Sequence, residues 1–288
     1  MRISLYLAIA ACLAGMGVVL HGAILSSRDA GFAQSNPETV SVTDGGFASD
    51  YFDLSYRAPD GWTEGLPGPA PSQSGYYVLG NWAPKGDFAG TILVVAQDMF
   101  FGPDSSDDVK SAVAQFRQVM SKVDGMTIDR EPTEVSVAGR PGYRVDFSGV
   151  GLFRSMFAIE IRCHVVMFNL TSRDAELLAS LAGSLDHLVP VRKTSDPVPE
   201  CVRDYASENV VHRVEPHAIG IRSVSVPVRV IVAADGSVKH VHVIHASAAQ
   251  QQNVEDAVRQ WKFKPYANQG HPVEVETGMV FNLKPASM

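Results

Sequence analysis

Every second residue from Val224 to Val232 is a valine. Side chains alternate between the two faces of a β-strand, so this spacing predicts a strand with one buried face. Asp235-Gly236 follows closely, and this pair tolerates the positive φ angles of a tight hairpin turn. Val241 and Val243 continue the alternation on the returning strand. The last third of the chain is therefore expected to contain a hairpin that buries one face.

A helix and a further strand are predicted after this hairpin. Four residues share one helical face, at positions i, i+3, i+4 and i+7: Val254, Ala257, Val258 and Trp261. Asn268-Gln269-Gly270 then predicts a turn. Alternating apolar residues run on from Val273 to Leu283. The predicted order is strand, strand, helix, strand, a ββαβ domain of the α+β class.

This order resembles the C-terminal domain of TonB-type energy transducers, at residues 201–284. That family is marked by an Asp-Gly turn, a helix ending Ala-Val-x-x-Trp, an aromatic residue before Pro, a Gly-x-Pro-Val segment and a late Phe. The corresponding residues here are Asp235-Gly236, Ala257-Val258-Arg259-Gln260-Trp261, Phe263-Lys264-Pro265, Gly270-His271-Pro272-Val273 and Phe281. Two features depart from the family: Val214-Glu215-Pro216-His217 replaces a Tyr-Pro pair, and His245-Ala246-Ser247 replaces a Ser-Gly pair.

The resemblance implies a protein-binding function. A small sheet covered by one helix leaves a strand edge with unpaired N–H and C=O groups, and an extended peptide can add there as a further strand. In the family, the added strand is a short peptide segment of an outer-membrane receptor, called the box, on the plug side of that receptor. The resemblance suggests the last strand as the docking edge, at Val273, Glu274, Val275, Glu276, Thr277 and Gly278. The alternative is that flanking segments or a dimer mate already cover this edge.

A second folded unit is predicted at residues 47–189, as a middle α/β sandwich domain. Runs of β-branched and aromatic residues predict several strands. One helical face recurs between Asp107 and Val123, and a final helix is predicted to start near Thr171 or Ser172. The aromatic-rich start and the order of elements resemble the PsbP/Mog1-like sandwich. That resemblance concerns the fold and carries no catalytic residues.

The N-terminal segment is the predicted membrane element. An apolar run of 23 residues extends from Ile3 to Leu25, and a membrane-spanning helix needs about 20. Residues 1–28 are therefore a retained signal anchor, or a signal peptide cleaved near Ala33. TonB transducers carry a Ser-x-x-x-His pair before Gly-Ala in this helix, which contacts a proton-driven motor. His21-Gly22-Ala23 is similar, with Gly17 at the serine position, so the resemblance suggests His21 as a motor contact. The alternative is a tolerated polar residue in a signal sequence.

Two connecting segments complete the predicted organisation. Residues 29–46 are rich in Ser, Gly, Asp and Thr without periodicity, which predicts a flexible tether. Residues 190–200 are rich in proline and predict a short, stiff linker between the middle unit and the C-terminal unit at 201–288.

Charge and motifs exclude several other functions. The chain has 24 Lys and Arg against 31 Asp and Glu, and the basic residues are scattered rather than gathered on the face that nucleic acid binding requires. No nucleophile elbow and no phosphate loop is present, so we predict no enzyme activity, no catalytic residue and no cofactor. His240, His242 and His245 are close in sequence. The alternation places the first two on the solvated face, so we predict no metal site.

The cysteines leave one question open. Cys163 and Cys201 can form a disulfide in an oxidising compartment, or remain free thiols, and spacing does not decide between the two. Cys12 lies in the apolar N-terminal run.

These observations predict a TonB-like periplasmic protein, tethered to the inner membrane by the run from Ile3 to Leu25. It would bind or couple protein partners, either outer-membrane receptors or inner-membrane motor proteins, by strand addition, and so support transmembrane transport. The alternative is a secreted periplasmic protein-binding module that is not coupled to a motor.

Overall fold

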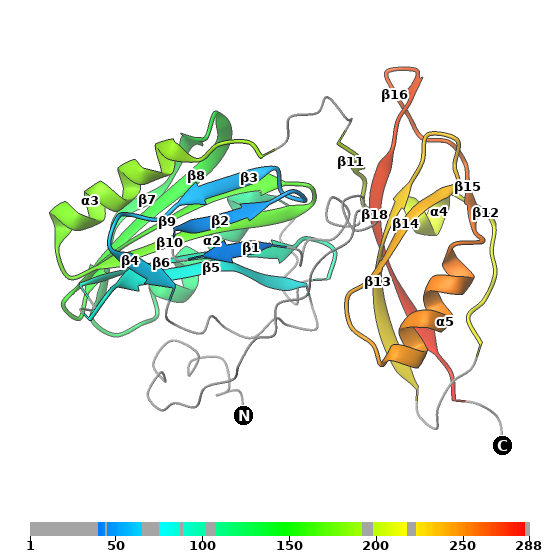
Figure 1. The fold of residues 1–288 in the computed structure, drawn as a ribbon, viewed down its shortest axis with the longest axis horizontal. Coiled ribbons are helices and arrows are strands. Elements are labelled where there is room, and N and C mark those ends of the chain that lie inside the picture. The colour runs from blue at the N-terminus through cyan, green and yellow to red at the C-terminus, as the bar shows by residue number, and fades with distance from the viewer. Residues whose placement is uncertain are drawn as a thin grey trace.

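The computed structural model describes residues 40–43, 45–64, 75–86, 89–101, 108–191, 198–217 and 223–285. These residues form two domains that lie side by side (Figure 1). The apolar run from Ile3 to Leu25, with His21, lies outside the described residues. Within the described ranges, no helix combines the length and the apolar character that crossing a membrane requires.

The middle domain is built on a seven-stranded antiparallel sheet. Its strands, in spatial order, are β4 (Trp62–Glu64), β5 (Tyr76–Pro84), β6 (Gly90–Asp98), β10 (His164–Ser172), β9 (Leu152–Ile161), β8 (Arg140–Gly149) and β7 (Met126–Val137). One face of the seven-stranded sheet is buried by a smaller sheet, by α3 (Ala175–Ser184) and by the following 3-10 turn (Leu185–His187). The small sheet is formed by β1 (Ser41–Thr43), β2 (Gly46–Ser49) and β3 (Leu54–Arg57). α2 (Val109–Met120) packs on the other face, so each face has its own apolar core.

Local capping sets where these helices begin. The Asp108 carboxylate accepts a hydrogen bond from the backbone N–H of Ser111 and so starts α2. The Asp174 carboxylate does the same for Glu176 and Leu177 at the start of α3. The prediction that this last helix starts near Thr171 or Ser172 was too early, because both residues continue β10, which pairs with β6.

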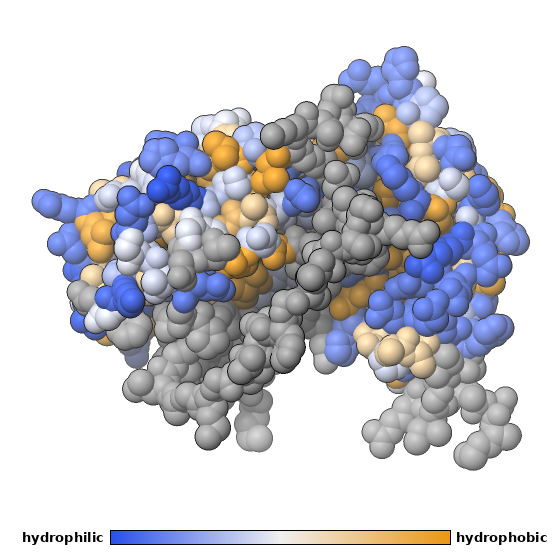
Figure 2. All heavy atoms as spheres, viewed as in Figure 1, coloured by the Kyte–Doolittle hydropathy of each residue, from blue (hydrophilic) through white to orange (hydrophobic). Residues whose placement is uncertain are grey.

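The C-terminal domain has the predicted order of elements. β13 (Val224–Val232) and β14 (Val238–Val243) form the hairpin, α5 (Ala248–Val258) follows, and β18 (Val275–Leu283) returns beside β13. At the hairpin turn Gly236 has φ 81°, and a Cβ there would lie 2.1 Å from the Phe263 carbonyl oxygen, so only glycine fits. The predicted helical face is buried, at 4% exposure or less for each of its residues. The outward side of α5 is hydrophilic (Figure 2).

Several short elements surround this core. α4 (Tyr205–Glu208) packs near β18, β12 (Val210–His212) pairs with β15 (Lys262–Phe263), and β16 (Ala267–Asn268) pairs with β17 (His271–Pro272). The sheet has the order β11-β18-β13-β14, in which β11 (Glu200–Cys201) is a parallel edge strand.

Two predicted boundaries change. The tether was predicted to reach residue 46, but Ser41–Thr43 and the start of Gly46–Ser49 belong to the small sheet, because Val42 pairs with Phe47 over the middle core. The linker was predicted to reach residue 200, but Glu200 already pairs with Val275. Both segments are therefore anchored to folded domains at one end.

Candidate functional site

β18 has one fully paired side and one partly paired side. On the inner side it pairs with β13 from Val275 to Leu283. On the outer side, among the described residues, its backbone pairs only with the β11 segment: Glu200 donates its N–H to the Glu274 carbonyl at 2.8 Å, and Val202 donates to the Glu276 carbonyl at 3.1 Å. The carbonyls of Glu274 and Glu276 therefore point outward.

The outer edge is open beyond β11. Backbone groups alternate in direction along a strand, so the N–H and C=O groups of Gly278, Val280 and Asn282 point the same way as those of Glu274 and Glu276. Among the described residues, no backbone hydrogen bond reaches these three residues from the outer side. This edge has room for a short added strand.

A groove lies along the open edge. It consists of two adjoining cavities of about 530 and 330 Å³, and Arg213, Val280 and Phe281 line both. The Trp261 side chain lines the smaller cavity, and its indole N–H donates to the Val214 carbonyl at 2.7 Å. The Arg213 guanidinium lies 5.0 Å from the centre of the Trp261 ring. The groove therefore combines an aromatic wall, a cation and open backbone groups.

The six residues predicted as the docking edge lie in different environments in the structure. Val273 donates its N–H to the Tyr266 carbonyl, and Glu274 forms an ion pair with Lys239 at 2.6 Å. Val275, Glu276 and Thr277 are fully buried. Gly278 alone borders the open edge. β11 pairs with the outer backbone of this segment, the core under α5 buries Val275 and Thr277, and the junction with the middle domain buries Glu276.

The second face of the C-terminal sheet packs against the middle domain (Figure 1). Glu276 is the centre of this junction: its carboxylate accepts hydrogen bonds from the Tyr51 hydroxyl at 2.6 Å, from Arg229 at 3.1 Å and from Arg162 at 3.0 Å. Arg229 also forms an ion pair with Asp98. Two carboxylates and two guanidiniums, all nearly inaccessible to solvent, therefore balance one another. We call these six residues, His164 included, the junction cluster.

His164 completes the junction cluster as a neutral ring. Burial, with the Arg229 charge beside it, holds the pKa of His164 well below its usual value. Its Nδ1 lies 2.7 Å from the Arg162 carbonyl and donates to it, so Nε2 is left as an acceptor facing Arg229 at 3.4 Å. Burial likewise raises the pKa of Tyr51. Both rings therefore take part without adding charge.

A disulfide joins the domains next to this cluster. Cys163, in the turn between β9 and β10, is bonded to Cys201 of β11, with the Cα atoms 5.4 Å apart. The pairing that spacing left open is therefore formed. It fixes the segment that covers the first part of the outer edge of β18.

The prediction that His240 and His242 face solvent was wrong. Both lie on the same face of the sheet as Arg229 and Glu276, because residues directly opposite on paired strands share a face. The middle domain covers this face, so His242 is 7% exposed. Burial lowers the pKa of His240 to about 4. Within the described part of the chain, no group of three or more metal-binding side chains occurs.

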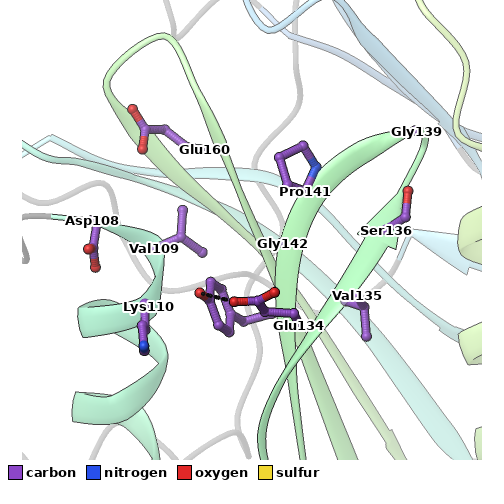
Figure 3. A pocket seen from close by; sticks show the side chains of 11 residues that line it. Asp108, Val109, Lys110, Glu134, Val135, Ser136, Gly139, Pro141, Gly142 and Glu160 are labelled. Atoms are coloured by element: carbon purple, nitrogen blue, oxygen red, sulfur yellow. Dashed lines mark hydrogen bonds between the residues drawn. The ribbon is translucent and has the colours of Figure 1, made fainter.

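A further cavity lies in the middle domain (Figure 3). It has a volume of about 820 Å³ and lies between the first turn of α2 and the β7–β8 hairpin. Asp108, Glu134 and Glu160 surround it, and the Tyr143 hydroxyl donates to Glu134 at 3.1 Å. Burial raises the pKa of Glu160. Its lining also carries Lys110 and Ser136 beside the three carboxylates.

Sequence reasoning missed the junction cluster. One signal was present: the face of β13 expected to be solvated carries Ile231 as well as Arg229, and an apolar residue there indicates a second buried face. Arg229 is bonded to Asp98 and Glu276, which lie far from it in sequence. No local pattern therefore connects these residues.

Comparison with known proteins identifies the C-terminal domain. Residues 222–283 match the family described as Gram-negative bacterial TonB protein C-terminal, which is generally non-enzymatic. No curated protein matches the chain. The middle domain has a distant structural resemblance to the PsbP and Mog1p folds.

Three solved structures illustrate that distance. Cyanobacterial PsbP (CyanoP) from Synechocystis sp. PCC 6803 is 9% identical, covers 54% of this chain and 94% of its own, and has a TM-score of 0.37. The Saccharomyces cerevisiae Ran-binding protein Mog1p is 13% identical, with 46% and 78% coverage and a TM-score of 0.29. LpqN of Mycobacterium tuberculosis, involved in cell envelope biogenesis, is 16% identical, with 59% and 100% coverage and a TM-score of 0.33.

Proposed function

We propose that this chain is a TonB-like coupling protein that captures an extended segment of a partner protein as an added strand on the outer edge of β18. The TonB C-terminal domain implies a role in energy transduction and protein partners such as TonB-dependent receptors, and it suggests the periplasm. The observation that carries the docking proposal is the set of outward backbone groups at Gly278, Val280 and Asn282.

Main-chain pairing and burial of apolar side chains would both contribute to such docking. Each main-chain hydrogen bond contributes about 0.5–1.5 kcal/mol net, and backbone pairing supplies affinity while side-chain pockets supply selectivity. The edge offers the side chain of Val280, which is 52% exposed. Burial of this apolar surface adds to the main-chain contribution.

The disulfide supports a periplasmic location for this protein. Disulfides form and persist in oxidising compartments such as the periplasm, and Cys163–Cys201 joins the two domains. We further propose that the run from Ile3 to Leu25 is a retained anchor in which His21 contacts a motor protein. N-terminal sequencing of the mature protein tests this, because a first residue at Gln34 or Ser35 would remove the anchor.

The second candidate is a periplasmic binding module without a motor. The junction cluster and the disulfide favour it, because they fix the C-terminal domain to a folded neighbour rather than to a long flexible spacer. Both candidates use the same docking edge. A His21→Ala variant separates them: receptor-dependent uptake falls if the chain is motor-coupled and is unchanged if it is not.

Docking itself is tested with Val280→Pro. The Val280 N–H points outward, so proline there removes a docking donor without breaking the pairing with β13. Val280→Ile is the matched control, because it keeps both the N–H group and an apolar β-branched side chain. The probe is a synthetic peptide carrying the box segment of a TonB-dependent receptor, titrated into the purified full chain by calorimetry.

We expect Val280→Pro to weaken peptide binding at least about tenfold, since it removes a hydrogen bond and obstructs the strand. Val280→Ile should stay within about threefold of the wild type. Equal affinity of the wild type and Val280→Pro would show that the peptide does not dock on this edge.

A further inference from the structure

Phe100 belongs to the middle domain but packs on the C-terminal sheet, on the face of β18 to which Gly278 belongs. It is the second residue after β6, and its side chain packs on Gly278 of β18. A Cβ at Gly278 would lie only 2.8 Å from the Phe100 Cβ. Glycine therefore lets the aromatic ring approach the strand where the outer edge becomes free.

Phe100 is held in this position by the junction cluster. Its backbone N–H donates to the Asp98 carboxylate at 2.7 Å, and the Arg229 guanidinium lies 4.8 Å from the centre of its ring. Asp98 and Arg229 are the ion pair that joins the two domains. The ring of Phe101 lies beside it, with the centroids 6.0 Å apart. Phe100 is thus oriented before any partner arrives.

The alternation of β18 determines what an added strand would meet. Met279 and Phe281 face the core under α5, so Gly278 and Val280 face the other way, towards the middle domain. A strand on the outer edge would direct every second side chain to that same face. There it would lie beside Phe100 and the half-exposed Val280.

We propose that the middle domain forms part of the docking site, and that Phe100 and Val280 together contact an apolar side chain of the docked strand opposite Gly278. The partner segment is therefore an extended stretch with apolar residues at alternate positions. This inference rests on the proposed function, because it needs a strand at that edge. It also assigns the junction cluster a role, which is to hold Phe100 at the edge.

A double-mutant cycle tests the contact. The protein variants are the full chain and Phe100→Ala, and the two peptides are the receptor box peptide and the same peptide with its apolar residues on one strand face replaced by serine. We expect Phe100→Ala to weaken binding of the parent peptide about tenfold, the scale of losing one apolar anchor. It should change binding of the serine peptide less than about twofold.

Cross-linking gives a second measurement that needs no protein variant. The box peptide carries a benzophenone at the apolar position, is irradiated with the wild-type chain, and the attachment sites are mapped by mass spectrometry. We expect adducts in Asp98 to Phe101 as well as in β18. Adducts confined to the C-terminal domain would overturn the inference.

The outcomes separate this inference from the proposed function. If Val280→Pro abolishes binding while Phe100→Ala weakens both peptides equally or neither, the edge docks a strand without the middle domain. If Val280→Pro has no effect, docking at this edge is itself wrong and both proposals fall. A complex that contains two copies of this chain and no peptide would overturn the choice of occupant.

Discussion

Glu276 shows how a single side chain connects the two domains. Its carboxylate is fully buried and accepts hydrogen bonds from Tyr51 and Arg162 of the middle domain and from Arg229 of its own domain. A buried ion pair contributes little over an apolar replacement, but removal of one partner leaves an uncompensated charge. The residue therefore specifies how the domains meet.

The first prediction follows at this scale. Glu276→Gln should lower the free energy of unfolding by about 3–5 kcal/mol, because Arg162 and Arg229 lose a buried counter-charge. Glu274→Gln is the matched control: its partner Lys239 is 55% exposed, and the loss should stay below about 1 kcal/mol. Urea denaturation of the full chain at pH 7 measures both. Similar losses for the two variants would contradict a buried cluster.

β11 is a two-residue element whose position depends on a covalent bond. Two backbone hydrogen bonds to β18 would hold so short a strand weakly, and the disulfide from Cys201 to Cys163 anchors it to the middle domain. It occupies the first part of the outer edge, where the last strand was predicted to be free. The element thus decides where docking can begin.

The second prediction belongs to this element. A double Cys163→Ser, Cys201→Ser variant should lose about 2–4 kcal/mol of stability. Hydrogen exchange at the amides of Glu200 and Val202 should accelerate, because the strand separates more readily from Glu274 and Glu276. The Ile244 amide, bonded to the Pro227 carbonyl in the same sheet, is the control. Its protection from exchange should fall only as far as the global free energy of unfolding falls. Unchanged protection at Glu200 and Val202 would show that β11 holds without the disulfide.

The whole molecule contains buried histidines at its junction. The charged and titratable groups that act on His164 are Arg229, Arg162, Asp98 and His242, and those that act on His240 are His242, Glu276, Arg259 and Arg162. Burial lowers the pKa of both histidines. The unfolded chain therefore binds more protons than the folded chain at acidic pH, so stability from these groups falls as the pH falls. Burial raises the pKa of Asp98. The stability that this carboxyl contributes therefore falls as the pH rises above the pKa of Asp98 in the unfolded chain.

The third prediction isolates one of these histidines. Because burial lowers the pKa of His240 to about 4, the window lies between that value and the unfolded value of about 6.5. Wild-type stability should fall by about 2 kcal/mol more than that of His240→Gln between pH 7 and pH 4.5. The exposed His271→Gln is the control and should follow the wild type. Parallel pH curves for His240→Gln and the wild type would show that His240 does not titrate in this window.

Local periodicity determined the order of elements in the C-terminal domain. Valines at every second position and the face from Val254 to Trp261 constrain each segment separately, because the side-chain direction repeats over a few residues. The hairpin turn at Gly236 follows from the same local chemistry. These features hold wherever the segment lies, so they could be predicted without the rest of the molecule.

Only the tertiary structure decided which faces and edges remain free. His240 and His242 were placed in solvent because alternation distinguishes two faces but does not say that a second domain covers one of them. The open edge likewise begins after Glu276 because Glu200 and Val202 donate to the carbonyls of Glu274 and Glu276, each 74 residues later in sequence. Contacts between such distant residues depend on how whole domains pack, and no local pattern in the chain records them.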